Sequence, residues 1–377
     1  MERKQKIALV LNTAWNIYNF RQNLVRQLTA SGYEVLLIAP VDDYVDSLKP
    51  LGCRFIAIKH LDKRGTNPLK DARLVFELRS IFRKERPDLI LNFTIKPNIF
   101  GSLAAKLLGT KAISTLTGRG RVELSSSIFD RGIKLLYRMA FSYCEKVVFQ
   151  NHDDLNFFLT QNLVNKAKCI VVPGSGVDLQ QFHPNGLVKD PALGDKTIFL
   201  LGARLLLDKG IREYTDAAKQ VKAKYPDTEF WLLGPVDDNP NQINEQHLKD
   251  WEKEGAIKYL GVTDNVQQFL TNADVVVLPS YYGEGVPRTL LESLAMQKPI
   301  ITTDHTGCRD TVDEGENGFL IPIKDVDALV EAMEKMIALG DAGREAMGKK
   351  SRKKAEQEFD DKIVISAYLK TIRSILT

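Results

Sequence analysis

The stretch VVVLPSYYGEGVPRTLLESLA, residues 275–295, carries the most informative pattern in the sequence. Its apolar start predicts a buried strand, and a glycine-rich polar loop that includes Glu284 follows the strand. Pro287 suits the first turn of a helix, because the N–H that proline lacks would have no partner there. The stretch therefore predicts a strand, a loop and a helix, with one carboxylate on the loop and a second, Glu292, on the helix.

Two carboxylates at this place suit a ligand that has both hydroxyl groups and negative charge. Ligands of parallel α/β sheets bind beyond the carboxyl ends of the strands. Free N–H groups and the dipole at a helix N-terminus favour an anion such as phosphate, and carboxylates accept hydrogen bonds from the hydroxyls of a sugar or ribose. An equally open alternative is that Glu284 is a solvated loop residue and that the helix dipole stabilises Glu292.

The stretch LLGARLLLDKGIREY, residues 200–214, predicts two cations at a similar edge. A strand is expected to end at Ala203, so Arg204 lies at its carboxyl end, and Lys209 opens the next helix. An arginine fork and a lysine point charge together suit a diphosphate. A purely structural role is the alternative, although a lysine at a helix start opposes the helix dipole.

Other glycine-containing segments are weaker signals. VVPGSGVDLQQFHP, residues 171–184, is not a dinucleotide fingerprint and is typical of a glycine-rich turn capped by Asp178. In the segment 301–321, Asp310 and the backbone around Gly307 either approach a ligand or belong to an ordinary loop. No glycine-rich phosphate loop follows the first predicted strand, which counts against an NAD dehydrogenase and against a P-loop enzyme.

The cysteines and histidines form no metal-binding pattern. The four cysteines have no C-x2-C spacing and the five histidines no ligand spacing. The D-x-D pair, Asp325 and Asp327, lies where a helix is expected to start and suits an N-cap. We therefore expect no bound metal, no disulfide and no cofactor, and free thiols suit a reducing cytoplasm.

Short apolar runs alternate with helical patterns along the whole chain, which is typical of parallel sheets covered on both faces. The expected strands are 6–12, 33–40, 53–60, 88–93, 111–118, 145–151, 196–203, 229–235, 257–261, 274–280 and 299–304. The expected helices are 18–32, 69–86, 98–109, 127–143, 209–226, 244–255, 266–273 and 287–297, with more helix over 325–377. The predicted fold class is α/β, with two doubly wound units in tandem.

Residues 179–195 contain proline, glycine and aspartate without an apolar period, so we place the linker there. The predicted domains are 1–180 and 195–360. Two such domains facing each other would form a cleft between them.

The chain of 377 residues has a net charge of +4 that is unevenly distributed. Residues 1–180 carry 27 Lys and Arg against 16 Asp and Glu, a net charge of +11, and residues 181–377 carry 25 against 32, a net charge of −7. A basic first half suggests an anionic partner, namely nucleic acid, acidic lipid or a phosphorylated substrate, with a solvated charged surface as the alternative. Because no stretch approaches the roughly 20 apolar residues of a membrane span and no signal peptide is evident, we expect a protein of the cytoplasm or of a membrane surface.

Taken together, these motifs resemble the retaining family 4 glycosyltransferases, whose GT-B fold has two Rossmann-like domains facing across a cleft. The E-x7-E signature of that family is matched by Glu284 and Glu292, and its phosphate-binding pair by Arg204 and Lys209. PGSGVD followed by Phe182 resembles the domain-joining motif, and NGFLI also matches. The resemblance implies that the last helix, 362–377, crosses back onto the N-terminal domain.

The N-terminal half resembles the branch of this family that builds bacterial capsule, O-antigen and protein-linked glycans. The matching segments are WNIYNFRQNLVRQLTASGYEVLLIAP, NFTIKPNIFGSLAAKLLG and TLTGRG. Members transfer a sugar from a UDP donor to a polyprenyl-diphosphate-linked acceptor on the cytoplasmic leaflet. Many carry a histidine near the fourth strand, where this chain reads NFTIKPN. The candidate acceptor-side residues are Asn16, Tyr18, Asn19, Thr94, Lys96, Thr117 and Arg119.

The resemblance also implies a role for each donor-side residue. Glu292 would accept from the ribose hydroxyls, Glu284 would hold a hydroxyl of the donor sugar, and Arg204 and Lys209 would neutralise the leaving diphosphate. The remaining donor contacts implied are Gly285, Val286, Pro287 and Arg288 at the sugar and diphosphate, with Gly261 and Val262 beside the base. No protein nucleophile is evident, which agrees with front-face attack by the acceptor hydroxyl.

We therefore expect a retaining glycosyltransferase that moves a hexose or N-acetylhexosamine from a UDP-sugar to a polyprenyl-diphosphate-linked saccharide, without metal or nucleic acid. One alternative is a nonhydrolysing UDP-sugar 2-epimerase, which shares the fold. Another is a catalytically silent subunit that binds sugar nucleotides. The basic, partly apolar helix 69–86 is a candidate for contact with an anionic membrane, and a helix packed on the sheet with a solvated basic face is the alternative.

Overall fold

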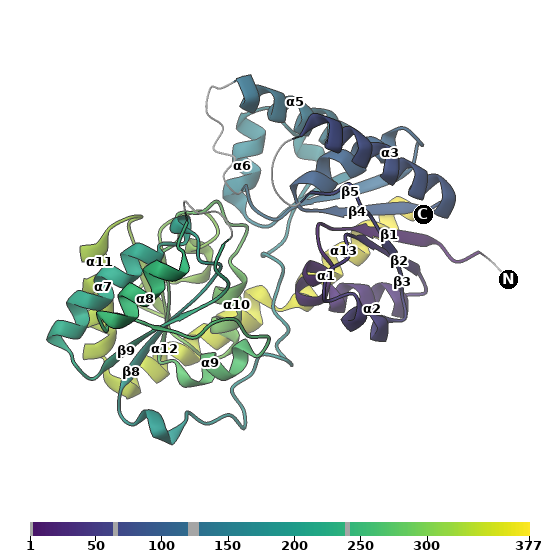
Figure 1. The fold of residues 1–377 in the computed structure, drawn as a ribbon. Helices are drawn as coiled ribbons and strands as arrows, with labels where there is room; N and C mark the ends of the chain where they lie inside the picture. Colours follow the sequence, from purple (N-terminus) through teal and green to yellow (C-terminus); the bar gives the residue numbers. More distant parts are fainter. Residues whose placement is uncertain (1–2, 63–66, 120–127, 238–241) are drawn as a thin grey trace. The chain divides into compact units, whose positions relative to one another are not determined.

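The computed structural model describes residues 3–62, 67–119, 128–237 and 242–377. The chain divides into two compact units, which Figure 1 shows as ribbons. The first unit consists of Met1–Ser175 together with Asp361–Thr377, and the second is Gly176–Asp360. The final helix thus belongs to the same unit as the N-terminal half of the chain.

The first unit contains a seven-stranded parallel sheet in the order β3-β2-β1-β4-β5-β6-β7. Its strands are β1 (Lys6–Val10), β2 (Glu34–Ala39), β3 (Arg54–Ala57), β4 (Leu89–Phe93), β5 (Lys111–Leu116), β6 (Lys146–Phe149) and β7 (Cys169–Val171). Its α-helices are α1 (Ala14–Phe20), α2 (Gln22–Ala30), α3 (Pro68–Glu85), α4 (Ser102–Lys106), α5 (Ile128–Tyr143), α6 (His152–Thr160) and α13 (Asp361–Leu376). The strand order turns back at β1, which makes this sheet doubly wound as predicted.

Strand β1 shows why the first sheet needs helices on both faces. Side chains alternate along a strand, so Ile7 and Leu9 point to one face and Ala8 and Val10 to the other. All four are fully buried. The first pair packs in one core with residues of α2 and α13, and the second pair packs in another core with residues of α3 and α4.

Two predicted helices of the first unit differ from the structure. The predicted helix 18–32 is two helices, because Thr13 caps α1 by accepting from the N–H of Asn16, and the backbone at Arg21 leaves the helical region between α1 and α2. The predicted helix 98–109 begins with a π-helical turn, Pro97–Gly101. The sequence analysis missed α6 and β7, and residue 127 at the predicted start of α5 lies outside the described residues.

The second unit contains a six-stranded parallel sheet in the order β10-β9-β8-β11-β12-β13. Its strands are β8 (Thr197–Gly202), β9 (Thr228–Leu233), β10 (Lys258–Tyr259), β11 (Val275–Leu278), β12 (Ile300–Thr303) and β13 (Gly318–Ile321). Its α-helices are α7 (Ile211–Lys224), α8 (Glu245–Lys253), α9 (Val266–Asn272), α10 (Arg288–Ala295), α11 (Val326–Ala338) and α12 (Gly340–Lys354). The predicted class of two doubly wound α/β units is therefore confirmed. Among the helices described, none is both long and apolar enough to cross a bilayer.

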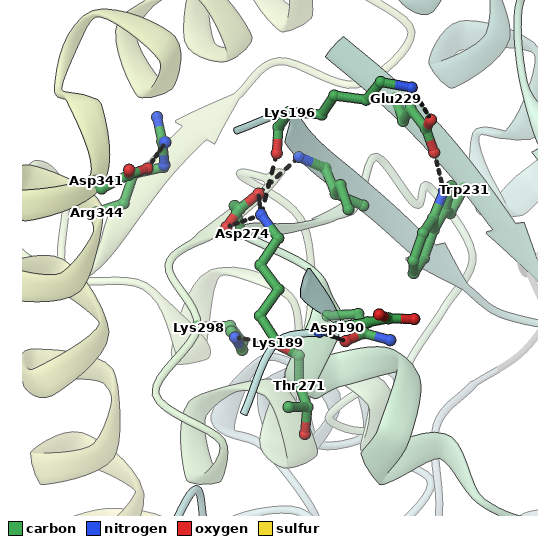
Figure 2. A network of polar contacts seen from close by, with 12 residues as sticks. Lys189, Asp190, Lys196, Glu229, Trp231, Thr271, Asp274, Lys298, Asp341 and Arg344 are labelled. Carbon is green, nitrogen blue, oxygen red and sulfur yellow. Dashed lines mark hydrogen bonds and ion pairs between the residues drawn. The ribbon is translucent and has the colours of Figure 1, made fainter. Parts of the chain in front are cut away.

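The segment 179–195, predicted to be the linker, packs within the second unit instead. The division between the units falls at Ser175 and Gly176, before this segment begins. Phe182 is buried in the core of the second unit. Figure 2 shows Lys189 reaching Asp274 at the start of β11, with its Nζ 2.8 Å from Oδ2. An apolar anchor and a partly buried ion pair, neither visible as periodicity, thus hold this segment on the second unit.

Asp274 is the centre of the polar network in Figure 2. Its Oδ2 accepts from Lys189 Nζ and, at 2.8 Å, from the N–H of Ile198 in β8. Lys298 lies nearby, and burial lowers the pKa of its ammonium to about 8 while the charge of Asp274 opposes that shift. One carboxylate therefore connects the 179–195 segment to the start of two strands.

We expect Asp274→Ala to lower the free energy of unfolding by about 2 kcal/mol or more, because it removes the charge partner of Lys189 and the acceptor of the Ile198 N–H. Urea unfolding followed by circular dichroism measures this loss. Lys196→Ala is the control, since the Lys196 side chain is half exposed and an ion pair at the surface contributes little to stability. Equal losses in the two variants would contradict the assigned role of Asp274.

Candidate active site

The loop between β11 and α10 forms the centre of the candidate site. Pro287 occupies the N-cap position of α10, so the helix begins at Arg288, one residue later than the sequence suggested. The hydroxyl of Thr289 donates to the carbonyl of Gly202 at 2.8 Å, which ties the start of α10 to the end of β8. The carboxyl end of β8 and the N-terminus of α10 therefore lie side by side.

The turn before α7 packs directly against this loop. Gly210 has a φ of +75°, and a Cβ atom there would lie 2.2 Å from the carbonyl oxygen of Pro279. The N–H of Tyr281 donates to the carbonyl of Asp208 at 2.9 Å. Only glycine combines that backbone conformation with so close an approach. The turn and the loop therefore form one surface that carries Lys209.

Lys209 and Glu284 meet on this surface. The Lys209 ammonium forms an ion pair with the Glu284 carboxylate, and their side chains are only 11% and 12% exposed. The hydroxyl of Ser280 lies 3.3 Å from the same carboxylate oxygen, and the Lys209 Nζ lies 5.1 Å from the ring centroid of Tyr282. The sequence analysis missed Ser280 and Tyr282, whose one signal was their place just after a strand end.

Glu292 forms the second ion pair of the site. Its Oε1 accepts from Nε of Arg288 at 2.8 Å, and both side chains are largely buried. Burial raises the pKa of the Glu292 carboxyl, and the charge and hydrogen bond of Arg288 oppose that rise. The sequence implied Arg288 only as a contact of the donor sugar and diphosphate and did not predict this side-chain pairing.

Arg204 lies at the same edge of the sheet but outside these pairs. Its side chain is exposed, and no hydrogen bond or ion pair joins it to any residue that the structure describes. Gly261 accepts from the N–H of Gly234 at 2.8 Å, and the neighbouring Val262 is exposed. Arg204 thus follows the carboxyl end of β8, and Gly261 and Val262 follow that of β10, while Gly285, Val286 and Pro287 are buried in the loop.

The loop after β12 supports the Glu284 loop from the protein side. Gly307 has a φ of +75°, and a Cβ atom there would lie 2.1 Å from the carbonyl oxygen of Gly285. Cys308 is fully buried, and its burial, reinforced by the charge of Glu284, raises the pKa of its thiol to about 12. Asp310 is exposed. Gly307 therefore has a packing role at this loop.

Within the described ranges, no three His, Cys, Asp or Glu side chains come together as a metal site would require. Asp325 caps α11 by accepting from the N–H of Ala328 at 2.9 Å, which confirms the predicted N-cap. The four cysteines are free. Independence from metal stays a prediction.

In the first unit, three strand ends carry predicted acceptor-side residues. Asn16, Tyr18 and Asn19 lie on α1, which follows β1, Thr94 follows β4, and Thr117 follows β5. The amide of Asn19 donates to the carbonyl of Trp15 at 3.0 Å. Because carboxyl ends of parallel strands meet at one edge, these residues share one edge of the first sheet.

Thr94 has an unusual conformation for a β-branched residue. Its φ is +70°, and this backbone conformation costs about 1–3 kcal/mol of strain energy for any residue other than glycine. Its hydroxyl oxygen is buried without a partner among the described residues, and the same holds for Oδ1 of Asn12 at the end of the neighbouring strand. Asn12 has no signal in the sequence beyond following a strand.

The two predicted acceptor-side cations are already paired. Lys96 Nζ lies 2.8 Å from Oδ1 of Asp71 at the start of α3, and Arg119 Nε lies 2.6 Å from Oδ1 of Asp154 in α6. The Arg119 guanidinium also lies 4.7 Å from the ring centroid of Phe157. Both cations therefore connect the loops after β4 and β5 to neighbouring helices.

The Asp154 carboxyl should make stability depend on pH. Burial raises its pKa from 3.8 to about 6, with Arg119 opposing the rise. Because the folded pKa lies above the unfolded one, the native state binds more protons in that window, and stability falls as the pH rises through it. The difference in unfolding free energy, wild type minus Asp154→Asn, should fall by about 2–3 kcal/mol between about pH 4 and pH 7. Parallel pH profiles from urea unfolding would contradict this expectation.

Two family models match the chain. Residues 6–151 match the model described as glycosyl transferase 4-like, and residues 188–354 match the model described as glycosyl transferases group 1. The matches fall in the two units and together cover most of the chain. Both models describe glycosyltransferases, so the chain belongs to the glycosyltransferases of group 1 and the type 4-like family. The resemblance predicted from the motifs is confirmed.

Relatives of known description cover most or all of the chain. An N,N'-diacetylbacillosaminyl-diphospho-undecaprenol alpha-1,3-N-acetylgalactosaminyltransferase of Campylobacter jejuni is 28% identical over 97% of each chain. A UDP-Gal:alpha-D-GlcNAc-diphosphoundecaprenol alpha-1,3-galactosyltransferase of Escherichia coli is 26% identical, over 78% of this chain and 76% of its own. A glycosyltransferase structure from Rickettsia africae superposes with a TM-score of 0.81 at 18% identity, over 100% of both chains, and supports the fold assignment.

Proposed function

We propose that the protein is a retaining glycosyltransferase that moves a hexose or N-acetylhexosamine from a UDP-sugar to a polyprenyl-diphosphate-linked saccharide in bacterial surface-glycan assembly. The observation that carries this proposal is the pair of ion pairs, Lys209 with Glu284 and Arg288 with Glu292, at the carboxyl edge of the second sheet. Cations suit a diphosphate and carboxylates suit hydroxyls, so the edge has partners for both parts of a nucleotide sugar.

The relatives support the substrates and the stereochemistry. The Campylobacter relative is named for a diphospho-undecaprenol acceptor, and the Escherichia relative for UDP-Gal and a diphosphoundecaprenol acceptor. Both are named as alpha-1,3 transferases. An α-linked product formed from an α-linked nucleotide sugar keeps its anomeric configuration, as a retaining transferase requires.

In the proposed reaction, charge develops on the diphosphate as its bond to the sugar breaks. Lys209 and Arg204 would stabilise that charge, together with the N-terminus of α10. Glu292 would hold the ribose and Glu284 a hydroxyl of the sugar. Because both carboxylates are engaged with cations, we propose that the acceptor hydroxyl, and not a protein side chain, attacks the anomeric carbon. We also propose that these cations take the place of a metal ion.

Replacing the cations should slow turnover more than it weakens binding. We expect Arg204→Ala and Lys209→Ala each to lower kcat by about 10²–10³, with a smaller change in KM for the UDP-sugar, because their interaction strengthens as the diphosphate leaves. Glu292→Ala should first weaken nucleotide binding, since the ribose hydroxyls do not change charge. Steady-state kinetics with a panel of UDP-sugars and an undecaprenyl-diphosphate-linked acceptor measures these effects.

Lys222→Ala is the charge-matched control, because Lys222 lies at the far end of α7 and donates to the carbonyl of Gly255. It should keep wild-type kcat. Near-normal kcat in both cation variants, with circular dichroism showing folded protein, would contradict the proposed donor site. Turnover that EDTA abolishes and Mg²⁺ restores would contradict the metal-independent mechanism.

We propose that the first unit binds an anionic membrane surface peripherally through α3 and α5. On α3, the apolar residues Leu74, Leu78 and Phe82 are buried on the sheet, whereas Leu69 is 75% exposed and Phe76 66%. One face of α3 thus packs on the sheet, as the alternative predicted, and the opposite face exposes apolar side chains. The exposed cations and apolar side chains of this face are Lys70, Arg73, Arg83, Lys84, Arg131, Leu135, Arg138 and Met139.

Vesicles that contain phosphatidylserine test this membrane face. We expect sedimentation of the protein with them at low salt and its release at high salt, since each cation near the surface contributes about 1 kcal/mol that salt screens. Phe76→Ser combined with Lys84→Glu should weaken binding about tenfold or more. Leu339→Ser, at an exposed position of the second unit, is the control. Undiminished binding of the double variant would contradict the assignment.

A further inference from the structure

The side chain of Arg288 joins three parts of the second unit. Its Nε donates to Oε1 of Glu292, and its Nη1 donates to the carbonyl of Gly176, each at 2.8 Å. Its Cζ lies 5.8 Å from the centroid of the Phe182 ring. A planar guanidinium can donate in two directions while facing a ring, and a lysine ammonium cannot reproduce that geometry.

Gly176 lies where the chain first enters the second unit. Beside it, the N–H of Val177 donates to the carbonyl of Phe359 at 2.8 Å, and Val177 forms a parallel bridge with Asp360. Asp360 is the last residue before the chain returns to the first unit. Arg288 therefore holds the entering segment next to the point where the two crossings of the chain run side by side.

The same guanidinium balances a buried carboxylate. Glu292 is largely buried, and an ionised carboxylate in such a place needs a cation or several donors. Ribose hydroxyls that donate to Glu292 would share its oxygens with Arg288. A ligand shifts a conformational equilibrium only if it interacts differently with the two conformations. Here the interaction that differs is the hydrogen bonding of the Glu292 carboxylate, which Arg288 holds without nucleotide and shares with the ribose when nucleotide is bound.

We propose that Arg288 is a positioning residue that couples nucleotide binding at Glu292 to the conformation of the crossing segment at Gly176 and Val177. The inference rests on the proposed function, which places the ribose at Glu292. When the ribose hydroxyls bind the Glu292 carboxylate, the Arg288 guanidinium changes its position. Because the guanidinium also donates to the Gly176 carbonyl, its movement changes the conformation of the segment at Gly176 and Val177. If the ion pair between Arg288 and Glu292 only stabilised the helix, nucleotide binding would not change the conformation of the segment at Gly176 and Val177.

Arg352 provides a matched control. Its Nη1 donates to the carbonyl of Phe182 at 2.8 Å and to that of Ala295 at 2.9 Å, and its Nε donates to Glu356 at 2.7 Å. Like Arg288, Arg352 binds a backbone carbonyl of the entering segment, that of Phe182, six residues after Gly176. It also pairs with a glutamate, Glu356, which is not part of the donor site. Replacing Arg352 removes a comparable clamp without touching Glu292.

Hydrogen exchange of residues 174–178, with and without saturating UDP, tests the coupling. In the wild type we expect UDP to slow exchange at Val177 several-fold, and Arg352→Gln should keep that response. Arg288→Lys retains a charge beside Glu292 but cannot also donate to the Gly176 carbonyl, so at saturating UDP it should lose the response. Arg288→Gln should bind UDP about tenfold more weakly and also lose the response.

Several outcomes would overturn the inference. An unchanged response in Arg288→Lys at saturating UDP would do so, as would an equal loss of response in Arg352→Gln. If Arg288→Gln does not fold, Glu292→Gln tests the coupling from its other end, and a full response in that variant would also count against it. Wild type that binds UDP without a change in exchange would contradict the coupling alone, whereas wild type that does not bind UDP would contradict the proposed donor and the coupling with it.

Discussion

The approach of Gly210 to the backbone of Pro279 is the contact on which the rest of the candidate site depends. The positive φ at Gly210 lets the turn before α7 lie against the loop after β11 with no side chain between them. Lys209 precedes that glycine and Glu284 lies on the facing loop, so the contact sets the distance between a cation and a carboxylate that are 75 residues apart in the chain. Any side chain at position 210 would separate the two loops and expose both charges to water.

The two ion pairs also explain how the protein keeps carboxylates in a largely buried place. An unpaired buried carboxylate would lose several kcal/mol of hydration. Each glutamate here has a cation beside it, Lys209 for Glu284 and Arg288 of the same helix for Glu292. Diphosphate oxygens compete for the cations, and hydroxyl groups compete for the carboxylates. A ligand that carries both kinds of group can therefore replace the internal partners of each side chain without leaving a charge uncompensated, which a free phosphate or a free sugar cannot do.

The sequence predicted the parts of the molecule that depend on local patterns. The two doubly wound units, the strand, loop and helix around Glu284, and the cap at Asp325 follow from periodicity and from residue preferences over a few positions. Strands β7 and β13 were missed, and both are short strands at the edges of their sheets. The pairing of Lys209 with Glu284, the contact from Arg288 to Gly176 and the packing of segment 179–195 on the second unit depend on tertiary contacts, and no local pattern reports them. Phe76 shows the same limit, because a helical apolar pattern does not say which of its members the sheet covers.

The helix α13 has a consequence for how the chain acquires its structure. Tyr368 on this helix meets Thr115 of β5 at 2.6 Å, and Val364 and Ile372 share a core with Ile7 of β1. The ribosome makes β1 and β5 long before it makes α13, and the whole second unit is synthesised in between. One face of the first unit's sheet therefore stays incompletely covered until α13 has been synthesised. By that time the second unit already has all of its residues. During synthesis the second unit can finish folding first, and the first unit closes its core only when α13 leaves the ribosome.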